Sequence, residues 1–210
     1  MRSTIVKGMI YKQVFRSSML SMIALLLFLP LGKGQAQTTN TVSPTPVFAL
    51  STNLLYDATT SMNLGVELKM GKHFTFKLPV TYNPWEWKDD KKWRFLLVQP
   101  ELRWWFCEPF YGSFIGLHGH GSYYNVGGIG TKAMTDYRYQ GYLYGGGISY
   151  GHQFYLSPRW NLEVSVGGGY VYLNYDQYHY YTDGALVKSQ QKEHHLWPTQ
   201  AGITLIYIIR

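Results

Sequence analysis

Residues 96–106 read Leu-Leu-Val-Gln-Pro-Glu-Leu-Arg-Trp-Trp-Phe, and this stretch decides the fold. Every even-numbered position from 96 to 106 holds an apolar residue, whereas Gln99, Glu101 and Arg103 hold odd-numbered positions between them. Successive side chains of a β-strand point to opposite faces. A period of two therefore predicts a strand with one apolar face and one charged face.

The same alternation recurs along the chain and predicts eight strands. The expected strands are 47–55, 63–70, 74–82, 93–106, 111–122, 139–156, 160–175 and 197–209. Charged residues in their central parts lie opposite the large apolar residues; they are Glu67, Lys77, Glu101, Arg103 and Glu163. We expect a closed sheet with one apolar surface and one surface that carries paired charges.

Two environments suit such a sheet. In a soluble, lipocalin-like periplasmic barrel the apolar face points inward and binds an apolar ligand, and the charges face water. In a membrane barrel the apolar face points outward to lipid. The interior of eight strands is only wide enough to be filled by side chains, and the large apolar residues would crowd it. The sequence therefore favours an all-β fold, an eight-stranded antiparallel up-and-down transmembrane β-barrel with a charged lumen.

The connections between the expected strands alternate in length. Apart from the first connection, 56–62, which is of modest length, three are short (71–73, 107–110 and 157–159) and three are long (83–92, 123–138 and 176–196). Outer-membrane barrels combine short periplasmic turns with longer external loops. This alternation predicts that the three long connections lie outside the cell.

The N-terminal stretch predicts export. Residues 1–36 combine basic residues, an apolar run from Met19 to Leu31 and a small-residue cleavage site at Gly34-Gln35-Ala36, the pattern of a secretory signal peptide. Residues 37–46 form a polar lead-in, and 47–210 form the expected barrel domain. We therefore place the protein in the cell outer membrane.

Charge and composition exclude other classes of function. The first 36 residues hold five of the 19 basic residues and none of the 12 acidic ones, so the remainder has 14 basic and 12 acidic residues, a net charge of +2. That balance does not predict nucleic-acid binding. The single cysteine, Cys107, cannot form an internal disulfide, and zinc-site spacing is absent. We expect a monomer with no metal and no cofactor, in contact with outer-membrane lipid.

Tryptophans near the strand ends suggest the aromatic belts of a membrane barrel. They are Trp85, Trp87 and Trp93 toward the long connections and Trp104, Trp105 and Trp160 toward the short ones. We expect these side chains to lie at the two membrane interfaces.

Four segments resemble a known family. Residues 53–60, 82–85, 97–108 and 160–163 are similar to a domain-of-unknown-function family of Bacteroidetes-type outer-membrane proteins, and the resemblance covers nearly all of the mature chain. It implies a small outer-membrane barrel, some of whose relatives are encoded beside fimbrial subunit genes. It implies no established activity and no catalytic residue. The chain ends in Ile208-Ile209-Arg210 rather than in an aromatic residue, which departs from the usual outer-membrane pattern.

Two groups of residues are candidate functional sites. His118, His120 and Ser122 share one strand face and could form the Ser–His pair of a lipid hydrolase, but no orienting carboxylate accompanies them. Contact residues of the long connection 176–196 suit a binding loop; they are Tyr178, His179, Tyr180 and Tyr181. The main hypothesis is a structural or interaction protein, not an enzyme, that binds a surface or fimbrial protein through its long outer loops. An outer-membrane lipid hydrolase is the alternative.

Overall fold

A computed structural model describes residues 46–86, 91–128, 137–179 and 185–209 of the chain. All of them belong to one compact unit, 44–210. The predicted signal peptide, the lead-in up to residue 45, and Trp87, Tyr180 and Tyr181 lie outside the described residues.

The described part is all-β apart from one five-residue helix. The elements are β1 (Phe48–Asn53), α2 (Leu54–Ala58), β2 (Met62–Lys69), β3 (Phe74–Glu86), β4 (Lys92–Val98), β5 (Glu101–Trp105), β6 (Gly112–Gly127), β7 (Tyr137–Ser157), β8 (Trp160–His179) and β9 (Leu186–Ile209). Across the described ranges, no helix is both long enough and apolar enough to span a membrane.

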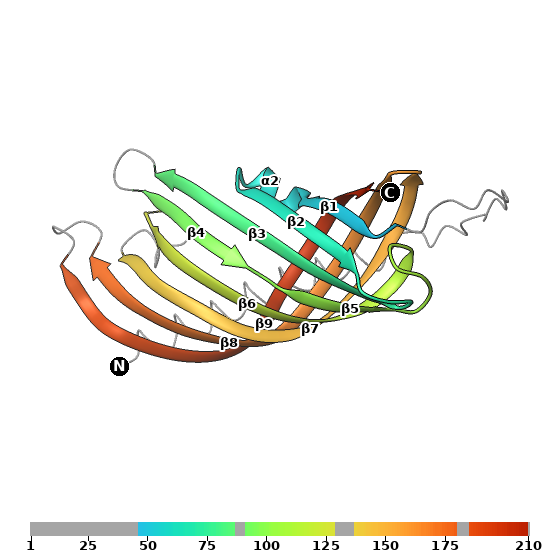
Figure 1. The fold of residues 1–210 in the computed structure, drawn as a ribbon. Coiled ribbons are helices and arrows are strands. Elements are labelled where there is room, and N and C mark those ends of the chain that lie inside the picture. The colour runs from blue at the N-terminus through green and yellow to red at the C-terminus, as the bar shows by residue number, and fades with distance from the viewer. Residues whose placement is uncertain (1–45, 87–90, 129–136, 180–184, 210) are drawn as a thin grey trace, which may run out of the picture. The chain divides into compact units, whose positions relative to one another are not determined.

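The strands form an antiparallel sheet that closes into a ring (Figure 1). Apart from β4 and β5, each strand pairs with its neighbour in sequence, and β1 closes the ring on β9, where Phe48 pairs with Ile209 and Asn53 with Thr204. β4 and β5 follow one another between β3 and β6, so they share one position in the ring. The expected antiparallel connectivity is therefore confirmed.

The break between β4 and β5 falls at Gln99-Pro100. Proline has no backbone N–H to donate to a ladder. The neighbouring groups still bond across the break: Gln99 N donates to Pro79 O at 3.1 Å, and Gly119 N donates to Pro100 O at 3.0 Å. The predicted strand 93–106 is thus two strands with one alternation.

The strands differ greatly in length. β1 has 6 residues and β2 has 8, whereas β7, β8 and β9 have 21, 20 and 24. The longer strands continue past the point where β1 and β2 end (Figure 1). We call this continuation the distal sheet; it comprises 83–86, 92–97, 120–127, 137–145, 171–179 and 186–200.

The prediction of a long loop over 176–196 is wrong. β8 continues to His179 and β9 begins at Leu186, so most of that segment is strand. The same holds for the flanks of the other two predicted long loops, since β3 extends to Glu86 and β7 begins at Tyr137. These stretches lack an apolar face, and this is why the alternation did not reveal them.

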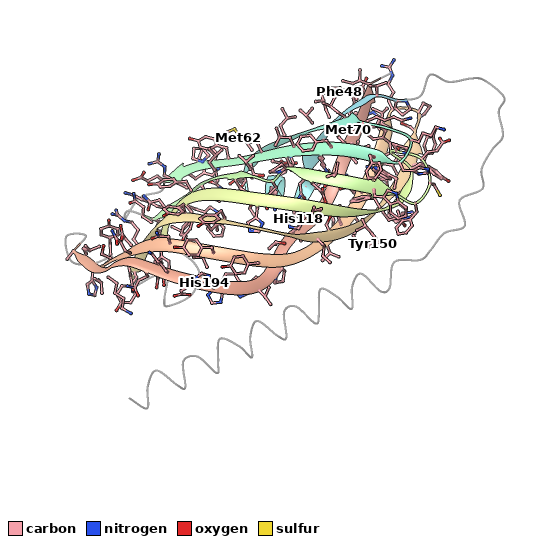
Figure 2. The ribbon with its side chains drawn as sticks, turned by 60° about the horizontal axis from the view of Figure 1, so that its bottom comes forward. Phe48, Met62, Met70, His118, Tyr150 and His194 are labelled. Atoms are coloured by element: carbon pink, nitrogen blue, oxygen red, sulfur yellow. The ribbon has the colours of Figure 1, made fainter. Side chains whose placement is uncertain are left out.

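The ring has a polar interior and an apolar exterior. Buried polar residues outnumber buried apolar ones among the described side chains, and the largest fully buried ones include Arg103, Gln153, Glu67, Glu101 and Glu163. Large apolar side chains such as Leu64, Leu117 and Ile148 are exposed. The lipocalin-like alternative required an apolar interior and is wrong for the described residues. Figure 2 shows side chains along the outside of the sheet, with Met70 near one end and His194 near the other.

Glycine makes room for the large charged side chains inside the ring. A methyl group at Gly116 would overlap with the Glu101 carboxylate and the Ser149 hydroxyl. Gly147 and Gly169 face each other in the β7–β8 ladder, and a side chain on either would strike the backbone of the neighbouring strand. Small residues at these positions allow the interior to hold charge without widening the ring.

Candidate functional site

The five charged residues that the sequence places on one face come together inside the ring. The fully buried guanidinium of Arg103 lies 3.2 Å from Glu67, 2.7 Å from Glu101 and 2.7 Å from Glu163. Lys77 Nζ lies 3.2 Å from Glu163 Oε1. We call these five residues the ion network.

The network has more acid than base. Three carboxylates face two cations, which leaves a formal charge of −1. Neutral donors complete the hydrogen bonding: Thr75 Oγ1 donates to Glu67 at 2.6 Å, Gln153 Nε2 donates to Glu163 at 3.0 Å, and Ser149 donates to Glu101. A buried charge is tolerated only with such partners.

Trp105 supports the network from the same interior. Its indole Nε1 donates to Thr75 Oγ1 at 2.9 Å, and its ring packs 4.9 Å from Phe114. Phe114 in turn lies 4.1 Å under the Arg103 guanidinium, a cation–π contact. Trp105 has an exposed fraction of 0%, so the predicted membrane-interface position of this residue is wrong.

A polar cavity of about 460 Å³, which includes space continuous with solvent, adjoins the network. Its lining includes Lys77 and Glu101, together with Gln99, Gln200 and Tyr56. Gln99 Nε2 donates to Thr199 O at 3.0 Å and so links β9 to the end of β4 across the interior. With this lining the cavity suits water and polar solutes, not an apolar ligand.

The helix α2 sits beside this cavity and was not foreseen. Asn53 Oδ1 accepts from Leu55 N at 3.1 Å and caps the helix. Asn63 Oδ1 accepts from Asn53 N at 2.6 Å, and Asn63 Nδ2 donates to Asp57 Oδ1 at 2.7 Å. These bonds tie the start of β2 to the end of β1. The cap residue at position 53 was the sequence signal that could have indicated the helix.

The histidine candidates lie inside the ring without a catalytic arrangement. His118 Nε2 contacts Thr199 Oγ1 at 2.8 Å, and the rings of His118 and His120 are 5.9 Å apart. The Ser122 hydroxyl donates to Tyr123 O at 3.4 Å, not to a histidine. Among the described residues no three His, Cys, Asp or Glu side chains could hold a metal. No observation here favours the hydrolase.

The remaining tryptophans divide between the two faces of the sheet. Trp104 and Trp160 are exposed on the outer face, near the short turns, where Trp160 packs 4.9 Å from Tyr207. Trp85 and Trp93 pair with each other on the strand positions that point inward. The Trp85 indole donates to Thr60 O at 2.7 Å, in the turn after α2. These two tryptophans therefore belong to the inner side of the distal sheet rather than to an outer belt.

Tyrosines, not tryptophans, mark the outer face at the distal end of the apolar surface. Tyr123 pairs with Tyr142 across the β6–β7 ladder. Tyr144 pairs with Tyr172 across the β7–β8 ladder, and the ring centroids of these two residues lie 4.9 Å apart. Polar residues follow on the outer face: Asn174 and Lys192 continue the row of Tyr123 and Tyr142, and Arg94, Asn125 and Gln140 form the row beyond it. Sequence reading missed this belt because tyrosines are spread over nearly every strand.

The inner face of the distal sheet gathers aromatic residues around one carboxylate. Tyr175 donates to Glu193 at 2.6 Å, and His195 Nε2 lies 2.8 Å from the same carboxylate. These two hydrogen bonds lower the pKa of Glu193. Burial, and then the nearby charge of Glu193, raises the pKa of Tyr124 to about 12. Tyr124 and Glu193 are therefore close on the concave side, although β7 and β8 lie between their strands.

Two of the predicted loop contacts are strand residues at the end of this sheet. Arg138 lies 4.8 Å over the ring of Tyr178, and Tyr137 packs 5.2 Å from His179. Both contacts join β7 to β8 within the ladder. Tyr178 and His179 thus form part of an ordered surface.

These features define a class of protein: an antiparallel strand ring with an ionic interior, an apolar exterior and a polar extension of the sheet. The chain belongs to the family described as "Protein of unknown function (DUF3575)", whose family model matches residues 21–209. No curated protein and no solved structure matches the chain. The expected membership of a family of unknown function is confirmed.

Proposed function

We propose that this chain is an outer-membrane β-barrel with a filled lumen, which serves as a structural and interaction protein of the cell surface. The observation that carries the proposal is the inverted burial, with charge inside and large apolar side chains outside. In water such a surface would drive aggregation. In lipid it is the expected exterior of a barrel.

The apolar surface has the height of a membrane. On β6 the outward-facing residues of the apolar surface lie within the nine-residue segment from Ile115 to Tyr123. A tilted membrane strand needs roughly 9–11 residues to cross the bilayer. Aromatic side chains bound the surface on both sides: the outer tyrosines at the distal end, and Trp104, Trp160 and Tyr207 near the short turns. Charged residues follow beyond each boundary, as in known barrels.

The filled lumen argues against a diffusion pore. Eight strands leave an interior just wide enough for side chains to fill. Here the fully buried Arg103 and its carboxylates occupy the centre of the ring. The part of the distal sheet beyond the outer tyrosines would stand outside the membrane and is then available to partners.

Partner binding is the activity that we propose for the distal sheet. The resemblance noted in the sequence makes a surface or fimbrial protein the first partner to test. Co-purification of the detergent-extracted protein with such a partner, lost on deletion of 176–196, is the expected result. Unchanged co-purification after the deletion would refute a role for this segment.

The membrane placement is tested by charge on the outer face. Leu117 and Ile148 pair with each other and are 65% and 67% exposed. In water, Ile148→Lys would change stability by less than about 0.5 kcal/mol. At the centre of a bilayer it would cost about 2–4 kcal/mol.

The experiment compares Ile148→Lys with Leu186→Lys in native outer membranes. Leu186 is also exposed but lies at the start of β9, beyond the tyrosine belt. We expect the wild type and L186K to fractionate with the outer membrane and to shift in gel mobility on boiling. I148K should shift at a lower temperature. A soluble wild type, or equal behaviour of the two variants, would refute the membrane placement.

A further inference from the structure

One edge of the distal sheet, along β9, has no neighbouring strand among the described residues. β9 pairs with β1 only from Thr204 to Ile209, and its pairing with β8 continues to Leu186. Along the rest of that side, no strand pairs with β9 among the described residues. Two further carbonyl groups of β9 are occupied: Asn53 Nδ2 donates to Ala201 O at 3.1 Å, and Gln99 Nε2 donates to Thr199 O at 3.0 Å. The open edge therefore runs from Pro198 back toward Leu186.

The regular part of this edge is seven residues long. From Gln191 to Trp197 the register with β8 is unbroken, whereas shifts occur on both sides of it. Gln190 has a positive φ of 51°, and Pro198 has no N–H. These irregularities bound a segment whose alternate backbone groups point to an unfilled strand position.

The opposite edge of the distal sheet is closed by its own side chains. On β3, Asn83 Oδ1 accepts from Trp85 N at 3.1 Å, and the Trp85 indole bonds to the turn after α2. No comparable side-chain cap is present along 191–197 in the described structure.

We propose that the β9 edge from Gln191 to Trp197 binds an extended segment of a partner polypeptide as an added strand. The added strand would continue the position that β1 occupies lower on the same edge. Main-chain hydrogen bonds would hold it, and side-chain positions would select its sequence. This inference rests on the proposed membrane placement, in which the edge begins at the tyrosine belt and continues outside the membrane, since His194 pairs with Tyr172 and Lys192 with Asn174.

The two faces of the edge specify the chemistry of that segment. On the inner face, His195 stacks on Trp197 with ring centroids 4.4 Å apart, and Trp197 is exposed. On the outer face, Lys192 has no ion pair in the described structure, and Leu196 is 83% exposed. The preferred segment therefore alternates aromatic or β-branched residues facing inward with acidic residues facing outward.

The edge also carries features that oppose indiscriminate pairing. Lysines and a proline on an edge strand discourage edge-to-edge aggregation. Lys188, Lys192 and Pro198 supply both here. A partner strand with acidic outward residues would form ion pairs with these lysines. A second copy of this edge would instead bring lysines close together, and their charges would repel.

The test is peptide selection on the full-length protein in detergent micelles. A phage-displayed library of random 12-residue peptides is selected for binding to the protein. Each selected peptide is then synthesised in two forms, one with N-methyl groups on the odd-numbered residues and one with N-methyl groups on the even-numbered residues. An added strand uses the N–H groups of every second residue. We expect methylation of one set to abolish binding and methylation of the other set to be tolerated.

Matched variants locate the site. Trp197→Ala should weaken binding about tenfold, equivalent to about 1.4 kcal/mol. Leu186→Ala, at an exposed residue at the start of β9 outside the 191–197 edge, should stay within about twofold, because it leaves the inner contact and the backbone edge intact. Absence of selectable peptides, equal tolerance of both methylated sets, or Trp197-dependent binding of glycans instead of peptides would overturn the proposal. Gel mobility of the same preparation shows separately whether the barrel is formed.

Discussion

Replacing Arg103 by methionine is expected to destabilise the folded chain by about 3–5 kcal/mol, the usual cost of removing one partner from a buried ion pair. Arg103 is fully buried, and its guanidinium contacts three carboxylates at distances of 2.7–3.2 Å. The variant leaves those carboxylates with Lys77 as the remaining cation. Methionine fills much of the vacated space, so the loss reports charge rather than a cavity.

A double-mutant cycle with Glu163→Gln identifies the cause of that loss. Glu163 accepts from the guanidinium at 2.7 and 2.9 Å, so E163Q alone should cost about 1–3 kcal/mol. In the R103M background the same change removes a carboxylate that has lost its main partner. The double variant should therefore be more stable than the sum of the single changes predicts, with a coupling energy of about 0.5–3 kcal/mol.

The assay is equilibrium unfolding in urea, with the protein folded in detergent micelles and followed by tryptophan fluorescence. Arg94→Met is the control, because Arg94 is half-exposed and its ion pair with Glu86 is 3.6 Å long. Exposed pairs contribute about 0–1 kcal/mol. If R103M costs no more than R94M, or if the cycle is additive, the ion network does not stabilise the fold.

Three further outcomes are expected. Gly116→Val should lower the urea midpoint by more than Gly121→Val does, since a side chain at 116 overlaps with Glu101 and open space surrounds position 121. Asn63→Ala should cost about 1–3 kcal/mol in the same assay, because it removes the four side-chain hydrogen bonds that join β1, α2 and β2. Glu193→Gln should lower the thermal stability of the distal sheet at neutral pH. Because the folded pKa of Glu193 is lowered, its contribution is present above about pH 4.3 and fades as pH falls further, so the two melting temperatures should converge in acid.

The alternation predicted strands correctly only where one face of the strand is apolar. Glu101 and Arg103 on one parity, with Leu102 and Trp104 on the other, sufficed to predict a two-faced strand, and the structure places the two charges together inside. The alternation predicts on which face of the sheet a residue lies, but not where along the strand the membrane interface falls. Trp105 shares the parity of Arg103 and is buried beside it, although its position near a strand end suggested an interface.

The alternation of apolar and polar residues could not predict the side-chain hydrogen bonds that connect neighbouring elements. The helix α2 depends on side chains from two strands, Asn53 and Asn63, which meet only after β1 and β2 pair. The inner position of Trp85 depends likewise on the turn that follows α2. Such contacts are set by tertiary structure, so short sequence windows do not contain them.

The failure over 176–196 follows from the proposed membrane placement. A strand alternates strongly only where its two faces meet different surroundings, here lipid outside and the ionic lumen inside. Past the tyrosine belt both faces of β8 and β9 would meet water or partner protein, so Asn174 and Lys192 can replace aliphatic residues on the outer face. On this argument, the residue at which alternation fades marks the height at which each strand leaves the bilayer. The argument predicts that lysine substitutions on the outer face become harmless at the same level, between Tyr172 and Asn174 on β8.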